Sequence, residues 1–486
     1  MTIKSLRSRK FRLPQSSLVK NSAWGIVANV LQISFVFLFF AIVARKYSSA
    51  NFAQFLISTT VYQLVAAFSS MGLGQWFIRQ YVLEDDQLTF TSKFLKTQLG
   101  LGIIFYLVNV LLAYILYPTD QIRILCLILG TNIIFDNFIN AIKSLNVVQN
   151  EQRKTATILI IDGFLKLLVG CMLFIYPFSI VVLSAAMIVV RILTLGLFMR
   201  LGSSNSINLM SLWVANVSYA DIKVLIIKNW QFIVIGSISI IYWKIGNIII
   251  SKLLTLTNVA DYEVSFRIFS VLQIMPVIAS TTIYPQFIKH YNEGNTNELK
   301  QLYKNIFTGY TLFAVITFAF MYSFSGLIIP LAFGNGYPGA VECMQQMFLT
   351  YLLLPTVLLQ ANLLVAIGLE KLDMWFNILS LIVNLTGCFI GLYFYKDLAV
   401  VNYSVFFSFL VFHILQDVSL IRKQIMTVIH CIMFYAVLGA TVLACYRLGT
   451  HANPYLFFLG FILVVLSSAI TLFYVSKRRP TYKTQL

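Results

Sequence analysis

The chain has 486 residues, of which 59% are hydrophobic and 11% are charged, and its formal net charge at pH 7 is +18. Soluble globular proteins are about 45–50% apolar and about 25% charged, so a soluble enzyme, a disordered protein and a disulfide scaffold are all excluded. Apolar runs recur along the whole chain, and each is near the ~20 residues that cross a bilayer as a helix. The sequence therefore predicts an all-α polytopic membrane protein.

These runs predict about fourteen transmembrane helices, which places both termini on the same side of the membrane. In chain order the predicted spans are 21–44, 52–74, 94–116, 121–142, 156–176, 178–200, 229–252, 260–284, 305–333, 342–368, 372–394, 398–419, 425–446 and 454–476. Basic tails flank them at 1–20 and 477–486, and the longest loop lies at 201–228. No loop is long enough to hold a catalytic domain.

The distribution of basic residues predicts the orientation. Most of those outside the spans lie in the two tails and in the loops that follow even-numbered spans. The opposite side has far fewer, namely Arg45, Lys46, Arg123, Lys252, Lys396 and Arg447. Lys and Arg are enriched in cytoplasmic loops, so both termini are predicted to be cytoplasmic. The linker 201–228 then lies at the inner surface, where residues 219–228 form either an interfacial helix or the approach to span seven.

A weak internal repeat predicts two lobes. At a shift of 210 residues, 50–52 falls on 260–262, and 77–81 falls on 287–291. Six spans lie in each repeat, so the two halves share one orientation in the membrane. The predicted lobes are residues 21–200 and 229–419, with a central cavity between them. Spans thirteen and fourteen, within residues 425–476, fall outside the duplication.

Four charges lie inside spans of the first lobe. They are Asp136, Asp162, Lys166 and Arg191, and Asp162 and Lys166 are four residues apart on one helix face. A charge at bilayer depth costs at least about 2.5–3.5 kcal/mol, so it faces a partner or a cavity. Two interpretations stay open: a neutral network that holds the lobe together, or a proton or cation site at one of the two aspartates.

The second lobe has an excess of positive charge at similar depth. Lys244 lies near the outer end of span seven, Arg267 lies near the outer start of span eight, and the nearest acid is Glu263. Snorkelling of both bases to the outer interface is one interpretation. The other is an anion site, since arginine binds phosphate bidentately and lysine acts as a point charge.

No catalytic constellation, metal-ligand spacing or phosphate-binding loop is found. The four histidines, His290, His413, His430 and His451, are scattered, and the six cysteines form no CxxC motif. The sequence therefore predicts no catalytic residue, no metal and no bound cofactor.

Several short motifs resemble one family. The first half has Asn-Ser-Ala-Trp at 21–24, Ala-Arg-Lys-Tyr at 44–47, Phe-Ala-Gln-Phe at 52–55 and Gly-Leu-Gly at 72–74, followed by Arg79. The second half has Tyr262, Arg267, Ile268, Tyr284, Pro285 and a hydrophilic loop at 292–295. Together with about fourteen spans in two lobes, these motifs resemble polysaccharide-unit flippases of the O-antigen and capsule type. That family belongs to the multidrug/oligosaccharidyl-lipid/polysaccharide exporter superfamily.

The resemblance implies a transporter of the bacterial inner membrane rather than an enzyme. Its substrate would be an oligosaccharide on a polyprenyl pyrophosphate, moved from the inner to the outer leaflet by alternating access for surface polysaccharide synthesis, such as lipopolysaccharide. Lipid II flippases of the superfamily have an arginine in a similar place to Arg267. Lys244 and Arg267, with Arg45 as a weaker third candidate, would bind the pyrophosphate.

The resemblance also implies partners and leaves one feature open. Membrane lipids and the polysaccharide polymerase machinery are the expected partners. Nucleic acid is not expected as a partner. Many relatives have a basic–Ile–Asp triplet in span seven, whereas this chain has Lys244-Ile245-Gly246, so the ion of any driving gradient is not identified. Two rival functions stay open: a multidrug cation exporter of the same fold, which needs acids facing the cavity, and a membrane glycan polymerase or ligase, which needs a large outer loop.

Overall fold

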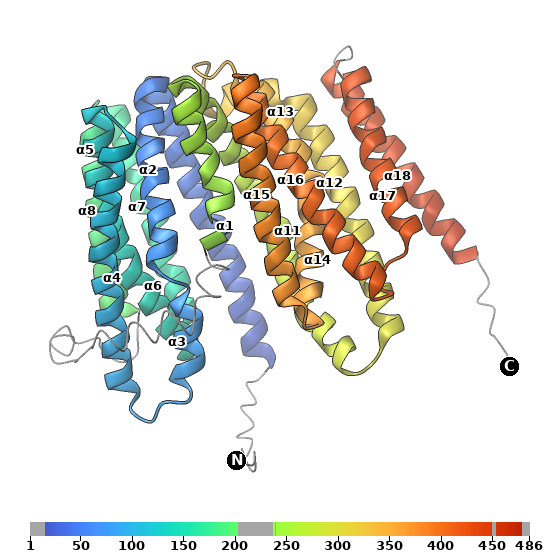
Figure 1. Ribbon diagram of the computed structural model, residues 1–486, viewed down its shortest axis with the longest axis horizontal. Helices are drawn as coiled ribbons and strands as arrows, with labels where there is room; N and C mark the ends of the chain where they lie inside the picture. Colours follow the sequence, from blue (N-terminus) through green and yellow to red (C-terminus); the bar gives the residue numbers. More distant parts are fainter. Residues whose placement is uncertain (1–14, 203–236, 239, 450–452, 479–486) are drawn as a thin grey trace. The chain divides into compact units, whose positions relative to one another are not determined.

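The computed structural model describes residues 15–202, 237–238, 240–449 and 453–478, and over these residues the chain is helical with no strand (Figure 1). Twelve of the helices in this part of the chain are long and apolar enough to cross a membrane. In a bilayer a helix satisfies all of its own backbone hydrogen bonds, which is why apolar sequence of this length folds in this way. The prediction of an all-α, multi-pass membrane protein is confirmed.

The chain divides into two compact units. Unit 1 comprises Met1–Phe40 and Val65–Val234, and unit 2 comprises Ala41–Leu64 and Ile235–Leu486. The second unit therefore includes the end of the first helix and most of the second. The lobe boundaries predicted at 21–200 and 229–419, and the separate status of 425–476, stay predictions.

The helices of the first half follow one another with short connections. They are α1 (Gln15–Lys46), α2 (Ser49–Ser69), α3 (Leu73–Tyr81), α4 (Gln87–Leu116), α5 (Asp120–Gly130), α6 (Asn132–Val148), α7 (Gln152–Ile175) and α8 (Ile180–Leu201). Span two ends earlier than predicted, because Met71 and Gly72 take left-handed backbone angles and α3 begins after them. Span four is two helices, which meet at Thr131.

The second half begins with a helical stretch at 240–253. It continues with α11 (Leu256–Asn292), α12 (Thr296–Phe333), α13 (Ala340–Tyr351), α14 (Leu354–Ala366), α15 (Glu370–Phe394), α16 (Leu398–Arg422), α17 (Val428–Ala444), the π-helical turn η1 (Cys445–Gly449) and α18 (Pro454–Arg478). Residues 240–253 and the apolar stretch Pro454–Ser467 coincide with predicted spans seven and fourteen. With the twelve longer helices, these segments approximately confirm the prediction of about fourteen spans.

Some predictions fall on residues that the structure does not describe. These are the interfacial helix at 219–228 with nearly all of its linker, most of the amino-terminal tail and most of the carboxyl-terminal tail. The orientation of the chain in the membrane stays a prediction.

A break in span ten positions polar groups inside unit 2. Helices α13 and α14 meet at Leu352 and Leu353, whose amides donate to Leu349 and Thr350 in a tight turn. Proline at residue 355 suits the first turn of α14, because a backbone N–H there has no partner within the helix. Helix α14 contacts α11, α12, α15 and α16, so its polar side chains are enclosed (Figure 1).

Candidate functional site

A buried carboxylate organises the charged cluster of unit 2. Glu263 on α11 is 1% exposed, and its Oε1 atom lies 3.0 Å from Lys244 Nζ and 2.6 Å from Arg267 Nη2. Arg267 is one turn further along α11, and Lys244 comes from the helical stretch at 240–253. The two bases that the sequence analysis singled out therefore share one acid. We call Lys244, Glu263 and Arg267 the cationic cluster.

The second oxygen of the carboxylate is bound as well. Asn247, one turn after Lys244, donates from Nδ2 to Glu263 Oε2 over 2.7 Å and to Thr60 Oγ1 on α2 over 3.1 Å. Asn247 and Thr60 are both buried. Glu263 is thus fixed in position by an amide as well as by the two cations, and it holds α2, α11 and the stretch at 240–253 together.

The cationic cluster has an aromatic wall. Lys244 Nζ lies over the ring of Phe266, 4.8 Å from its centroid, which is a favourable cation–π distance. Trp243 packs against Phe266 and Phe269, with ring centroids 5.8 and 5.2 Å away. The side chains of Lys244 and Arg267 are 12% and 15% exposed, whereas Glu263 is 1% exposed. The two bases are therefore more accessible than the acid that they share.

Arg45 has a different role in the structure. Its Nε donates to the carbonyl of Ala332 over 3.0 Å, and its Nη2 donates to Pro330 over 3.3 Å and also to Leu331. These carbonyls belong to the last turn of α12, where helical acceptors are left over and the helix dipole favours a cation. The structure thus places Arg45 at the end of α12 and not in the cationic cluster.

The connection after α12 is tied to the same place. Tyr337, in the loop between α12 and α13, donates from its hydroxyl to the carbonyl of Ala44 over 2.7 Å. Burial raises the pKa of Tyr337, so its hydroxyl stays protonated and remains a donor. Arg45 and Tyr337 together fasten the end of α1 to α12 and to the loop that follows it.

In unit 1 the four charges predicted from the sequence meet in one network. Lys166 Nζ lies 2.6 Å from Asp162 Oδ2, and Arg191 lies 3.5 Å from Asp162 Oδ1 and also pairs with Asp136. Thr194 donates to Asp162 over 2.9 Å. Two acids and two bases balance, and Asp162 is 1% exposed. These ion pairs link α6, α7 and α8.

A second buried polar group in unit 2 was missed by the sequence analysis, which treated His413 as isolated. His413 Nδ1 lies 3.0 Å from Asp417 Oδ2, one turn along α16, and 2.8 Å from the hydroxyl of Tyr435 on α17. Gln360 on α14 donates to Asp417 Oδ1 over 2.7 Å. The spacing of a histidine and an aspartate four residues apart inside an apolar span was the available signal.

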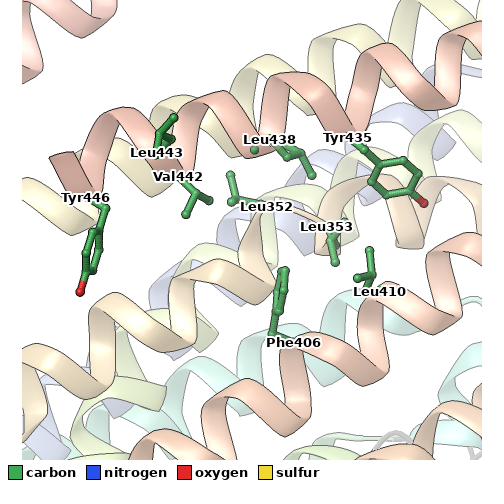
Figure 2. A pocket seen from close by; sticks show the side chains of 10 residues that line it. Leu352, Leu353, Phe406, Leu410, Tyr435, Leu438, Val442, Leu443 and Tyr446 are labelled. Atoms are coloured by element: carbon green, nitrogen blue, oxygen red, sulfur yellow. The ribbon is translucent and has the colours of Figure 1, made fainter. Parts of the chain in front are cut away.

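An apolar groove lies beside this group, between α17, α16 and the turn that joins α13 to α14 (Figure 2). Its volume is about 490 Å³. The lining side chains are aliphatic and aromatic, from Leu352, Leu353, Phe406, Leu410, Tyr435, Leu438, Gly439, Val442, Leu443 and Tyr446. Within the described part of the chain, no group of three or more His, Cys, Asp or Glu side chains is arranged to hold a metal ion.

Solved structures of transporters share this fold. The lipid II flippase MurJ, in an inward closed conformation, matches with a TM-score of 0.73 and 12% identity, over 95% of this chain and 100% of that one. An inward-facing MATE multidrug resistance transporter of the MOP superfamily matches with a TM-score of 0.64 and 12% identity, over 82% and 98%. A MOP-superfamily transporter from Pyrococcus furiosus, described as having a binding pocket of reversed polarity, matches with a TM-score of 0.56 and 14% identity, over 85% and 96%.

These likenesses define the class of fold: the chain has the fold of MOP-superfamily transporters and flippases. More particularly, the chain belongs to the polysaccharide biosynthesis protein family, whose model matches residues 42–342. A search of curated proteins found no matching sequence. The family resemblance stated from the sequence is thereby confirmed.

Proposed function

We propose that the chain is a flippase that moves an oligosaccharide unit, linked to a polyprenyl pyrophosphate, from the inner to the outer leaflet of the bacterial cytoplasmic membrane. The observation that carries this proposal is the cationic cluster, in which two bases share one buried acid. Both bases lie at a depth where a charge is costly unless it faces a partner or a cavity. A multiply charged anion such as a pyrophosphate is a ligand that both bases can bind together.

The geometry of the cluster suits competition between the substrate and Glu263. Arg267 presents a planar fork of N–H donors that matches two phosphate oxygens, and Lys244 adds a point charge. A pyrophosphate carries more negative charge than one carboxylate, so it draws both bases from Glu263 toward their more exposed edge. Glu263 stays held by Asn247 and receives the bases again when the substrate leaves. Between transport cycles, pairing with this carboxylate lowers the energetic cost of the two positive charges inside the membrane.

The rest of the substrate finds matching surfaces in unit 2. Trp243 and Phe266 give an aromatic wall of the kind that stacks on sugar rings. The groove along α17 has the apolar lining that a prenyl chain needs (Figure 2). Membrane lipids and a polysaccharide polymerase are the partners in this proposal, which places the protein in surface polysaccharide synthesis, with transport by alternating access.

The test is analysis of lipid-linked glycans in cells that depend on this chain for export. Arg267→Ala should stop export while the protein stays in the membrane at its normal level, and the lipid-linked unit should accumulate in the inner leaflet. Arg267→Lys should keep part of the activity, because the charge remains and the bidentate fork does not. Lys252→Ala is the matched control, since it removes an exposed cation beyond Lys244 on the same helical stretch.

Two results would overturn the proposal. One is normal export by the double variant Lys244→Ala, Arg267→Ala. The other is loss of export by Lys252→Ala to the same degree as by Arg267→Ala.

A multidrug cation exporter is the second candidate, because MATE transporters share the fold. Such a function needs an acid that faces a cationic drug. In unit 2 the best placed acid, Glu263, is already bound by two bases, which disfavours a cationic substrate. Drug susceptibility of the deletion strain distinguishes the two: unchanged susceptibility with accumulated lipid-linked glycan supports the flippase, and the opposite pattern supports the exporter.

A further inference from the structure

A buried histidine and aspartate lie on α16, away from the cationic cluster. His413 is 0% exposed and Asp417 is 3% exposed, and Phe434 on α17 stacks on the imidazole with ring centroids 4.7 Å apart. Asp417 accepts hydrogen bonds at both oxygens, from Gln360 at Oδ1 and from the Tyr435 hydroxyl at Oδ2, each over 2.7 Å. Hydrogen-bond donors at both oxygens favour the ionised form of a carboxylate. His413 lies beside Asp417 and can carry the positive charge that balances it.

The hydrogen bonds around the imidazole fit a ring that carries two protons. On one side Nδ1 faces Asp417 Oδ2, which is an acceptor. On the other side Nε2 lies 3.1 Å from Thr356 Oγ1, and Thr356 already gives its own proton to the carbonyl of Leu353 over 2.8 Å. Both ring nitrogens therefore lie within hydrogen-bond distance of an oxygen that can accept, which suits a ring with a proton on each nitrogen. The face of Phe434 against the ring also favours a cation.

A small rearrangement accommodates the ring with one proton fewer. When Nε2 loses its proton to water, the Thr356 hydroxyl turns from Leu353 and donates to Nε2. The Leu353 carbonyl keeps a partner, because it also accepts from the amide of Val357 over 3.0 Å. The two states thus differ by one proton and one hydroxyl rotation. Leu353 lies at the break between α13 and α14, so the proton changes the hydrogen bonding at a joint between two helices.

Other titratable groups face this pair from the surrounding helices. Tyr303 of α12 accepts from Gln360 over 3.1 Å, and Tyr435 and Cys431 of α17 both interact with Asp417. Asp373 of α15 accepts from Gln416 of α16 over 2.9 Å. Gln360 of α14 and Tyr435 of α17 thus bond to Asp417 directly, whereas Tyr303 of α12 bonds to Gln360 and Asp373 of α15 bonds to the neighbouring Gln416. Tyr435 also lines the apolar groove (Figure 2).

We propose that His413 and Asp417 form a proton-binding site in unit 2, and that proton binding and release there is the ion movement coupled to transport. The coupling part of this inference rests on the proposed function, whereas the proton site itself does not. His413 is nine residues from Arg422, so the site lies about 14 Å from the end of α16 that the predicted orientation places at the cytoplasm.

The proton site is tested by nuclear magnetic resonance of the full-length protein with ¹⁵N-labelled histidine, in vesicles of phosphatidylethanolamine and phosphatidylglycerol. One signal should change reversibly from the imidazolium to the neutral form as the pH rises. That signal should be absent from His413→Gln and present in His430→Gln, the control, since His430 is a partly exposed histidine of the neighbouring helix. If the His413 signal shows the same protonation form at every pH at which the protein stays folded, the proposal is wrong.

Thr356→Val gives a second test that keeps the histidine. The change removes the acceptor for Nε2 and leaves Asp417 in place, so the imidazolium signal should be weaker than in the parent protein at the same pH. An unchanged signal would contradict the account of the hydrogen bonds given above.

Coupling is tested by export in cells, alongside Arg267→Ala. His413→Gln should lower export severalfold at a normal protein level, and His430→Gln should not. Arg267→Ala should stop export and keep the titrating His413 signal. Loss of export in Arg267→Ala without any titration of His413 would sink the proton site and leave the proposed function standing. Titration of His413 together with normal export in Arg267→Ala would sink the proposed function and leave the site.

Discussion

Glu263 and Asp162 show how the surroundings of a buried carboxylate decide its use. Each is 1% exposed, and each is held by two cations, Lys244 and Arg267 for Glu263 and Lys166 and Arg191 for Asp162. In unit 1 a second acid, Asp136, also pairs with Arg191, so the charges cancel. Among the ion pairs of the described residues, no second carboxylate joins Glu263. The two carboxylates therefore share a pattern of two bases, and they differ in the second acid that joins the network of unit 1.

Asp162→Asn should destabilise the protein. The change leaves two bases facing a neutral amide inside the membrane, and breaking a buried ion pair from one side costs about 3–5 kcal/mol. Thermal unfolding of the purified protein should show the loss, together with a lower level in the membrane. Asp120→Asn is the control, because Asp120 is 88% exposed beside Arg123 and such pairs contribute about 0–1 kcal/mol. Normal stability of Asp162→Asn with loss of transport would instead assign Asp162 to ion coupling.

At the scale of the helix, end groups decide which segments are fastened. At the end of α12, Arg45 donates to three carbonyls, of which that of Pro330 also accepts from the amide of the cap residue Gly334. At the start of α4, Asp86 accepts from the backbone amide of Thr89 over 3.1 Å. A cation at a carboxyl end and an anion at an amino end both oppose the charge of the helix dipole. Loss of either contact should therefore weaken the helix end at which it lies.

Arg45→Ala should lower the thermal stability of the protein by about 1 kcal/mol and leave glycan export nearly normal, because its contacts are to the end of α12. Thermal unfolding and glycan export are the two measurements. Lys46→Ala, which removes the next basic residue of the same helix end, is the control. If Arg45→Ala stopped export at unchanged stability, Arg45 would belong to the substrate site.

The first turn of α4 should fray in acid. Hydrogen bonds from Thr89, through its side chain and then its backbone, hold the pKa of Asp86 below its usual value. The stabilisation is therefore full at neutral pH, where the carboxylate is ionised in both states, and it is lost as the pH falls through the folded-state pKa. Hydrogen exchange of the amides of residues 88–90 should speed up over that range, after correction for the intrinsic rate. In Asp86→Ala these amides should exchange fast at every pH, and a pH-dependent protection that survived in Asp86→Ala would refute this account.

For the whole molecule, the excess of basic residues predicts its placement. The tails and the loops after even-numbered spans hold most of the basic residues outside the spans, and cytoplasmic loops are enriched in them. The even number of predicted spans then puts both termini in the cytoplasm. The connection between α11 and α12, residues 293–295, is predicted to lie on the same side.

Reporter fusions check this orientation. A reporter joined after Lys483 and a reporter inserted between α11 and α12 should both show cytoplasmic activity. A fusion in the loop between α12 and α13 should show the opposite location and serves as the control. A periplasmic location for either of the first two would reverse the topology, and with it the direction of transport proposed above.

By itself the sequence determined the fold class, the approximate spans and the residues whose charge is out of place. Hydropathy is a local property, and a helix in a bilayer satisfies its own backbone, so spans can be predicted without knowing their neighbours. The cost of a charge in hydrocarbon likewise singled out Lys244, Arg267 and Asp162 one at a time. Helix breaks at Thr131 and at Leu352 were missed, because each lies within a continuous apolar run.

Only the tertiary structure decided the partners of these residues. Asn247 donates to Glu263 and to Thr60, which lies 187 residues before it in the chain. Tyr435 and Gln360 donate to Asp417 from two other helices. Arg45, a candidate substrate-binding residue from the sequence, donates to carbonyls at the end of α12. Such contacts depend on how each helix is rotated and shifted against its neighbours, which packing and shared hydrogen bonds determine. The order of residues along one helix does not contain that information, because the same face can meet many different surfaces.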